Sequence, residues 1–128
     1  MIDQKFSKPI FADEDGYEIS CREIASQHIA EQLTSSKTAV ELCCAVGVTT
    51  IQLSKKIDKV YGVDINKFRI NCAIKNAGLY GVDDKVEFII GDVLEKKLLN
   101  KIKAEVAILD PDWSVLGTKR VTMLTIQI

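Results

Sequence analysis

The stretch TAVELCCAVGVTTIQLSKKIDKVYGVD, residues 38–64, predicts a strand, a tight turn, a helix and a second strand. Residues 39–44 are an apolar run interrupted only by Glu41, which is typical of a strand buried on both faces of a parallel sheet. A turn follows at residues 45–47. Thr49 is suited to cap a helix that carries the apolar residues Ile51, Leu53 and Ile57. The second strand, residues 60–63, ends at Asp64.

The carboxyl ends of these two strands form the predicted ligand site. A β–α–β unit crosses over right-handed, so both strands end at the edge where open α/β sheets bind ligands. A small-residue turn lets a ligand approach backbone N–H groups, and an acid ending the next strand accepts hydrogen bonds from ribose hydroxyls. Asp64 follows Gly47 by 17 residues, near the spacing expected for that role. The unit therefore predicts a nucleoside-type cofactor site; the alternative is a buried turn without a ligand.

The composition of the turn narrows the choice of cofactor. Dinucleotide-binding turns carry three glycines, whereas this turn has Cys43, Ala45 and Gly47. The missing glycines disfavour NAD and FAD, whose pyrophosphate needs an open loop, and favour S-adenosyl-L-methionine, which has no phosphate. Thr50 and Ile65, which adjoin the turn and Asp64, complete the expected cofactor-binding set.

Composition and charge limit the number of domains, the partners and the location that we expect for the protein. The 128 residues fit one domain, and a hydrophobic content of 47% is enough for a core. The net charge of −1 gives no overall attraction to nucleic acid, so RNA binding requires a local patch. No signal-peptide or membrane-spanning run is present, which predicts a cytoplasmic protein without a membrane partner. We expect reduced thiols and no metal site, because no C-x-x-C pair occurs and Cys43 and Cys44 should point to opposite faces of a strand.

The sequence predicts a boundary at residue 17. Residues 1–17 are predicted to form a polar, irregular arm, either solvated or a flap over the cofactor or substrate, and residues 18–128 form the cofactor-binding domain. Ser20 and Glu23 have the spacing of a capping box, so a helix is expected to begin at Ser20. His28 is expected on the surface of this helix, rather than as a base or ligand. The apolar stripe of the helix is Ile24, Ala25, Ile29 and Leu33.

Beyond Asp64, predicted helices and strands alternate. Asn66 is the expected cap of a helix and Gly78 its C-terminal glycine. The inner side of that helix is expected to be Phe68, Ile70, Ala73, Ile74 and Ala77. Strands are expected at residues 86–90 and 105–109. Leu94, Leu98 and Ile102 repeat every four residues and predict a helix between these strands. Its lysines form either a solvated face or a phosphate-contacting patch: Lys96, Lys97, Lys101 and Lys103.

Acidic residues end three successive predicted strands. They are Asp64, Asp92 and Asp110, and a fourth acid, Glu41, lies within the first strand. In a site for a nucleoside joined to methionine, each has a separate role. Asp64 would accept from the ribose and Asp92 from the adenine amino group, while Glu41 would meet the ammonium group directly or through water. Asp110 lies where a methyl acceptor is expected.

Five segments together resemble the class I S-adenosylmethionine-dependent methyltransferases and, more closely, the trimethylguanosine synthase family of RNA cap guanine-N2 methyltransferases. VELCCAVGVTTIQL resembles that family's cofactor loop, VYGVDIN its ribose-binding strand end, and NAGLYGVDDKVEFIIGD the segment ending at its adenine-binding acid. DEDGYEIS followed by REIASQHIA resembles the stretch leading into its first helix. DPDW resembles its Pro-Pro-Trp signature, with Asp112 in place of the second proline.

The resemblance implies an α/β fold with a Rossmann-like, predominantly parallel sheet. It also implies methyl transfer from S-adenosyl-L-methionine to the exocyclic N2 of guanine, or of 7-methylguanine, in an RNA substrate. Asp110 and the carbonyl of Pro111 would accept the hydrogens of the amine and aim its lone pair, and Trp113 would stack on the base. Three alternatives stay open: a non-catalytic cofactor-binding or scaffold module, a methyltransferase for another nucleic-acid base or a protein amide, and a nicotinamide-dependent oxidoreductase.

The resemblance further implies an incomplete sheet. The full fold has seven strands in the order 3-2-1-4-5-7-6, but only 15 residues follow Trp113. The chain is then either a truncated or frameshifted reading or a minimal domain that relies on a partner. We expect Val106 and Ile108 on the fourth strand to be uncovered unless residues 121–128 cover this edge. The expected consequence is a homo-oligomer or a partner chain at the edge.

Overall fold

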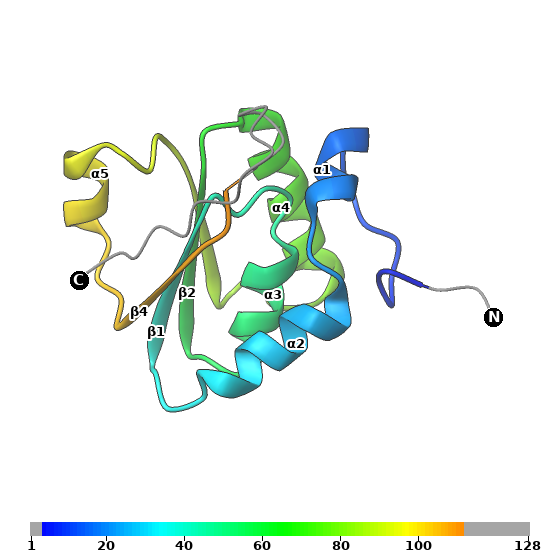
Figure 1. Ribbon diagram of the computed structural model, residues 1–128, viewed down its shortest axis with the longest axis horizontal. Coiled ribbons are helices and arrows are strands. Elements are labelled where there is room, and N and C mark those ends of the chain that lie inside the picture. Colours follow the sequence, from blue (N-terminus) through cyan, green and yellow to red (C-terminus); the bar gives the residue numbers. More distant parts are fainter. Residues whose placement is uncertain (1–3, 112–128) are drawn as a thin grey trace, which may run out of the picture.

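The computed structural model describes residues 4–111 (Figure 1). Helices and strands alternate from the first strand onward, as the sequence predicts. Trp113 and residues 121–128 lie outside the described residues, so the roles predicted for them stay predictions. The elements are α1 (Glu14–Ile19), α2 (Glu23–Gln32), β1 (Thr38–Leu42), α3 (Val48–Ser54), β2 (Lys59–Asp64), α4 (Lys67–Leu79), β3 (Val86–Ile90), α5 (Lys96–Lys101) and β4 (Val106–Leu109).

The four strands form one parallel sheet in the order β3-β2-β1-β4, which confirms the α/β fold and the expected order. From β1 through β2 to β3 the chain moves in one direction, so right-handed crossovers place α3 and α4 on the same face. The chain then returns to β4, and α5 lies on the opposite face (Figure 1). The direction changes between β1 and β4, so their carboxyl ends border the crevice where such sheets bind ligands.

The main core lies between the sheet and helices α2 and α3. It is built from the buried residues Ala30, Ala39, Leu53, Ile57 and Val60. Val106 and Ile108 of β4 are partly buried and pack against this cluster, so the expectation that these two side chains are uncovered is wrong. They point to the helix-covered face, because residues two apart on a strand share a face, and Ala107 between them is the exposed one.

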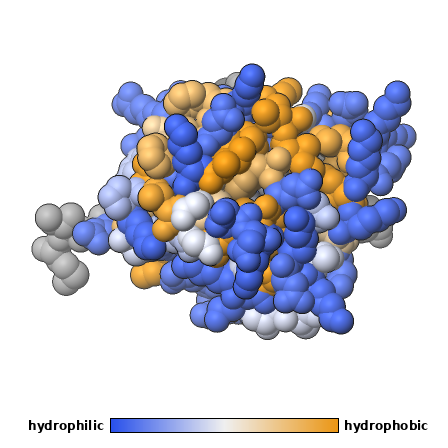
Figure 2. All heavy atoms as spheres, turned by 180° about the vertical axis from the view of Figure 1, so that it is seen from behind, coloured by the Kyte–Doolittle hydropathy of each residue, from blue (hydrophilic) through white to orange (hydrophobic). Residues whose placement is uncertain are grey.

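Apolar side chains nevertheless remain on the surface. Leu94 is 84% exposed and Ile90 is 48% exposed. Figure 2 shows one face of the molecule, on which hydrophobic residues gather between hydrophilic ones in the upper half of the view. Self-association through an apolar surface or through the edge of β4 stays a prediction.

The N-terminal segment packs against the domain, so for residues 4–17 the interpretation as a solvated arm is wrong. Phe6 is 9% exposed and lies in a cluster with Val46, Val48 and Cys72. The backbone of Phe11 hydrogen-bonds the buried Asn76 side chain in both directions, at 2.7 and 3.0 Å. The segment then forms α1, which was not predicted, beside α4 (Figure 1).

Three predicted helix boundaries are wrong; a local hydrogen bond accounts for one of them and a tertiary contact for another. Helix α2 begins at Glu23, because Ser20 ends α1, where its Oγ donates to the carbonyl of Gly16 at 2.6 Å. Helix α3 has Gly47 at its N-cap, and Thr49 Oγ1 instead lies 2.9 Å from Ser26 Oγ. Helix α4 continues past Gly78 to Leu79.

Some of the other helix predictions are confirmed, and others are wrong. Asn66 caps α4, since its side chain accepts from the backbone N–H of Arg69, and His28 is exposed on α2, both as expected. Three apolar residues expected on inner helix faces are exposed instead: Ile24, Phe68 and Ile74. Within residues 4–111, no helix is both long enough and apolar enough to cross a bilayer.

Candidate functional site

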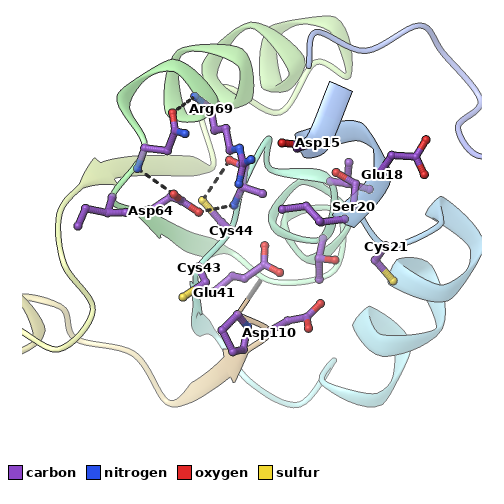
Figure 3. Close-up of a pocket in the computed structure, with 17 residues that line it drawn as sticks. Asp15, Glu18, Ser20, Cys21, Glu41, Cys43, Cys44, Asp64, Arg69 and Asp110 are labelled. Atoms are coloured by element: carbon purple, nitrogen blue, oxygen red, sulfur yellow. Dashed lines mark hydrogen bonds between the residues drawn. The ribbon is translucent and has the colours of Figure 1, made fainter. Parts of the chain in front are cut away.

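A cavity of about 890 Å³ opens at the carboxyl ends of β1, β2 and β4, where the sequence places the ligand site (Figure 3). Its volume lies toward the upper end of the range usual for small-molecule pockets. The strands and their loops supply one part of the wall, and α1 with the residues after it supplies another. The lining residues are Asp15, Glu18, Ile19, Ser20, Cys21, Glu41, Cys43, Cys44, Ala45, Val48, Thr49, Asp64, Ile65, Asn66, Arg69, Asp110 and Pro111.

The loop between β1 and α3 has an unusual backbone. Cys43, Ala45 and Gly47 have φ angles of 64°, 50° and 86°, which only glycine adopts without strain. The strand therefore ends at Leu42, two residues before the predicted end, and Cys43 and Cys44 do not alternate across a sheet. Strained backbone of this kind persists only where surrounding contacts hold it.

Asp64 holds this loop from the end of β2. Its Oδ2 accepts the backbone N–H of Ala45 at 2.8 Å, and its Oδ1 accepts that of Asn66 at 2.9 Å. The residue is 9% exposed and lines the cavity (Figure 3). A carboxylate oxygen has more than one acceptor direction, so Asp64 can still accept from a ligand.

Glu41 is the most deeply buried acid of the cavity wall. It is 4% exposed, and its Oε1 accepts both the backbone N–H and the hydroxyl of Thr50, at 3.1 and 2.7 Å. Glu41 thereby satisfies a free amide at the start of α3, which no side chain within α3 caps. Burial raises the pKa of Glu41 to about 8, against the effect of the Thr50 hydrogen bonds and together with the nearby charges of Asp110 and Asp64. A cationic group placed in the cavity would favour the ionised form.

Cys43 also lines the cavity, but its chemistry does not suit a nucleophile. Burial raises the pKa of its thiol to about 11, and the carboxylates of Asp64 and Glu41 act in the same direction. The thiolate is the reactive form of cysteine, and it is scarce at neutral pH with such a pKa.

Three residues predicted for cofactor binding do not line the cavity: Gly47, Thr50 and Asp92. A Cβ on Gly47 would lie 2.9 Å from Ala73 Cβ and 3.0 Å from the Phe88 ring, so the space is filled by the core rather than by a ligand. Thr50 is fully buried behind Glu41. Asp92 is exposed, and its Oδ1 accepts the backbone N–H of Leu94 at 2.9 Å.

The remaining predicted residues are brought together with several that sequence reasoning missed. Cys43, Ala45, Asp64, Ile65, Asp110 and Pro111 share the cavity with Glu41, as predicted. The missed residues include Asp15 and Glu18 of α1 and Arg69 of α4, which pairs with Asp13 at 3.3 Å. The flap interpretation of residues 1–17 pointed to Asp15, whereas no sequence signal pointed to Glu18 or Arg69.

The chain also matches a known protein family. The model of the RNA cap guanine-N2 methyltransferases matches residues 36–116, which is more than half of the chain. This chain belongs to that family. Trimethylguanosine synthase of Saccharomyces cerevisiae is 33% identical over 84 residues, an alignment that covers 63% of this chain and 27% of that protein. The chain thus spans about a quarter of the length of this relative.

Solved methyltransferase structures share the fold of this family member. An RNA methyltransferase from Salinibacter ruber in complex with S-adenosyl-L-homocysteine is 26% identical, with a TM-score of 0.57; the match covers 73% of this chain and 59% of that one. An O-methyltransferase from Bacillus cereus is 15% identical, with a TM-score of 0.66 over 80% of this chain and 56% of that one, a likeness of fold alone.

Proposed function

We propose that this chain binds S-adenosyl-L-methionine and transfers its methyl group to RNA, at the exocyclic N2 of guanine or 7-methylguanine. The observation that carries the proposal is the cavity itself, at the switch point between β1 and β4, with Asp64 and Glu41 in its wall. Family membership and the complex of the Salinibacter ruber enzyme with S-adenosyl-L-homocysteine support the choice of cofactor.

The residues of the cavity fit this cofactor. Asp64 would accept from the ribose hydroxyls while it holds the loop through Ala45. Glu41 has one oxygen engaged by Thr50, and its second oxygen would receive the ammonium group. Asp92 would reach the adenine only from outside the cavity lining.

The acceptor half of the reaction would depend on alignment. When bound, the cofactor supplies an electrophilic methyl group for an in-line displacement. Asp110 and the carbonyl of Pro111, both in the cavity wall, would accept the hydrogens of the guanine amine and aim its lone pair. Trp113, outside the described residues, would stack on the base, an interaction worth about 1–3 kcal/mol.

Calorimetric titration tests cofactor binding first. We expect S-adenosyl-L-methionine and S-adenosyl-L-homocysteine to bind and NAD not to bind. Asp64→Ala should weaken binding by about 1–3 kcal/mol, the usual effect of losing a buried hydrogen-bond partner. Asp58→Ala, an exposed acid just before β2, is the matched control and should leave affinity unchanged. Unchanged affinity in a folded Asp64→Ala protein would refute the assignment of Asp64.

Transfer of tritium from labelled cofactor tests the acceptor. Guanosine, capped RNA, uncapped RNA, DNA and protein are offered separately, and label in N2-methylguanine is the expected result. Asp110→Asn should lower the transfer rate while leaving the affinity for S-adenosyl-L-homocysteine unchanged. Label in adenine or protein amide instead would assign this chain another acceptor.

A second candidate is a cofactor-binding module without transferase activity. The residue that favours it is Asp112, since the signature resembled by DPDW has proline there. This candidate predicts that the chain binds S-adenosyl-L-homocysteine and labels none of the offered acceptors.

A further inference from the structure

Helix α1 forms a wall of the cavity but has little hold on the domain by itself. Asp15, Glu18 and Ile19 line the cavity, yet Gly16 is the only buried residue of the helix. A six-residue helix with one buried residue is not stabilised by its own packing. Its N-cap residue, Asp13, pairs with Arg69 of α4, and the rest of its position must be determined by the segments on either side of it.

Lys5 connects the preceding segment to the end of α1. Its ammonium donates to the carbonyls of Tyr17 and Glu18, in the last turn of the helix. A cation at this place satisfies free carbonyl groups and interacts favourably with the helix dipole. The same ammonium lies 4.9 Å from the centre of the Tyr17 ring, a cation–π distance.

Glu23, at the start of α2, holds the segment that carries Lys5. Its backbone N–H donates to the carbonyl of Lys5 at 3.1 Å. Its carboxylate accepts the backbone N–H and the hydroxyl of Ser7, at 2.8 and 2.9 Å, and also the side-chain amide of Gln52 on α3, at 3.2 Å. The Glu23 side chain thus joins the N-terminal segment to two helices of the core.

The burial and charge of Glu23 suit this role. The residue is 7% exposed, and burial alone would raise the pKa of its carboxyl. Hydrogen bonds from Tyr80 and Ser7, with the charge of Lys55, outweigh burial and hold the pKa below its usual value. The ionised carboxylate is therefore the form that the surroundings favour, and charge-assisted hydrogen bonds of this kind are the strong ones.

We propose that Glu23 is a positioning residue for the cofactor cavity: through Ser7 and Lys5 it fixes α1 as one of the cavity walls. Glu23 does not line the cavity, so any effect it has on a ligand is indirect. The inference rests on the proposed function in one respect: S-adenosyl-L-homocysteine is taken to bind in this cavity, so that its affinity reports whether α1 is in place.

The test compares Glu23→Gln with the matched control Glu31→Gln, an exposed glutamate on the same helix. Glutamine has one acceptor oxygen, so it cannot satisfy Ser7 and Gln52 as the carboxylate does. Hydrogen exchange of residues 13–21 reports the order of α1, and calorimetry with S-adenosyl-L-homocysteine reports the cavity. Ser7→Ala removes one of the Ser7 bonds, and Ser7→Thr restores the hydroxyl.

In Glu23→Gln we expect faster exchange in residues 13–21, unchanged exchange in α4, and a loss of affinity of about tenfold, which is about 1.4 kcal/mol. Ser7→Ala should show smaller changes in the same direction, and Ser7→Thr and Glu31→Gln should match the wild type. Unchanged exchange and affinity in a folded Glu23→Gln protein would overturn the proposal. If Glu23→Gln does not fold, Ser7→Ala and Ser7→Thr decide by the same criteria.

Failure of the proposed function gives a different result. If the wild type does not bind S-adenosyl-L-homocysteine, the cofactor assignment is refuted, and hydrogen exchange in residues 13–21 alone still decides whether Glu23 positions α1. Uniformly faster exchange across α1, α3 and α4 in Ser7→Ala would mean that the contact stabilises the whole fold, and it would overturn a specific role in the cavity wall.

Discussion

Two strand–helix regions of the same sheet differ completely in burial. All seven residues of α3 are buried, whereas α5 has no buried residue. In β1, Ala39, Val40 and Glu41 are buried; in β4 every residue is at least partly exposed. We call residues 38–64 the inner unit and residues 96–109 the outer unit.

Position in the sheet contributes to this difference, together with the lysines of α5. Strand β1 has neighbours on both sides, and α3 lies in contact with α2, α4 and the sheet. Strand β4 pairs with β1 alone among the described strands, and α5 is the only described helix on the opposite face (Figure 1). The same substitution should therefore be costly in the inner unit and cheap in the outer one.

The largest contrast is expected from deleting a leucine side chain. Leu53→Ala in α3 removes a fully buried side chain and should lower the free energy of unfolding by about 2–5 kcal/mol, because a cavity remains. Leu99→Ala in α5, where the side chain is 36% exposed, should cost much less. Urea unfolding of both variants measures the difference, and equal losses would show that the outer unit is as tightly packed as the inner one.

Replacing one glycine in the inner unit and one just before the outer unit tests the same difference in packing. Gly47→Ala should cost about 1–3 kcal/mol for the left-handed backbone alone, and contacts with Ala73 and Phe88 would add to it. Gly91→Ala, before α5, would meet only the end of the flexible Leu98 side chain at 2.8 Å, which can move aside. Thermal unfolding should show a lowered midpoint for Gly47→Ala and little change for Gly91→Ala; the reverse order would contradict the geometry of the loop.

A further contrast concerns the pH dependence of stability. The pKa of Glu41 is raised from 4.5 to about 8, so the folded state holds a proton that the unfolded state releases. Its stabilising contribution is complete below pH 4.5 and is lost as the pH rises to about 8, with a slope of at most about 1.4 kcal/mol per pH unit. Glu41→Gln, which stays neutral and keeps an acceptor for Thr50, should remove this slope.

Glu95→Gln, an exposed glutamate next to α5, is the matched control for that measurement and should keep the wild-type slope. Unfolding free energies at several pH values between 5 and 8 compare the three proteins. If Glu41→Gln retained the wild-type slope, another group would be responsible for the pH dependence.

The sequence by itself determined the sheet and the place of its site. Apolar runs at residues 39–44 and 60–63, with acids at or near their ends, were sufficient because burial on both faces leaves a continuous hydrophobic pattern. The order of the four strands was implied by the family resemblance, and the shared cavity of Glu41, Asp64 and Asp110 follows because parallel strands end at the same edge of the sheet.

Only the tertiary structure decided which side chains serve that site and which serve the fold. Gly47 and Thr50 carry the right residue types, but their partners, Phe88 and Glu41, come from other elements. Glu23 has the spacing of a capping box, yet its carboxylate binds Ser7 and Gln52. Local spacing specifies what a side chain can do, whereas its actual partner is the group that folding leaves within hydrogen-bond distance, and that group is often remote in the sequence.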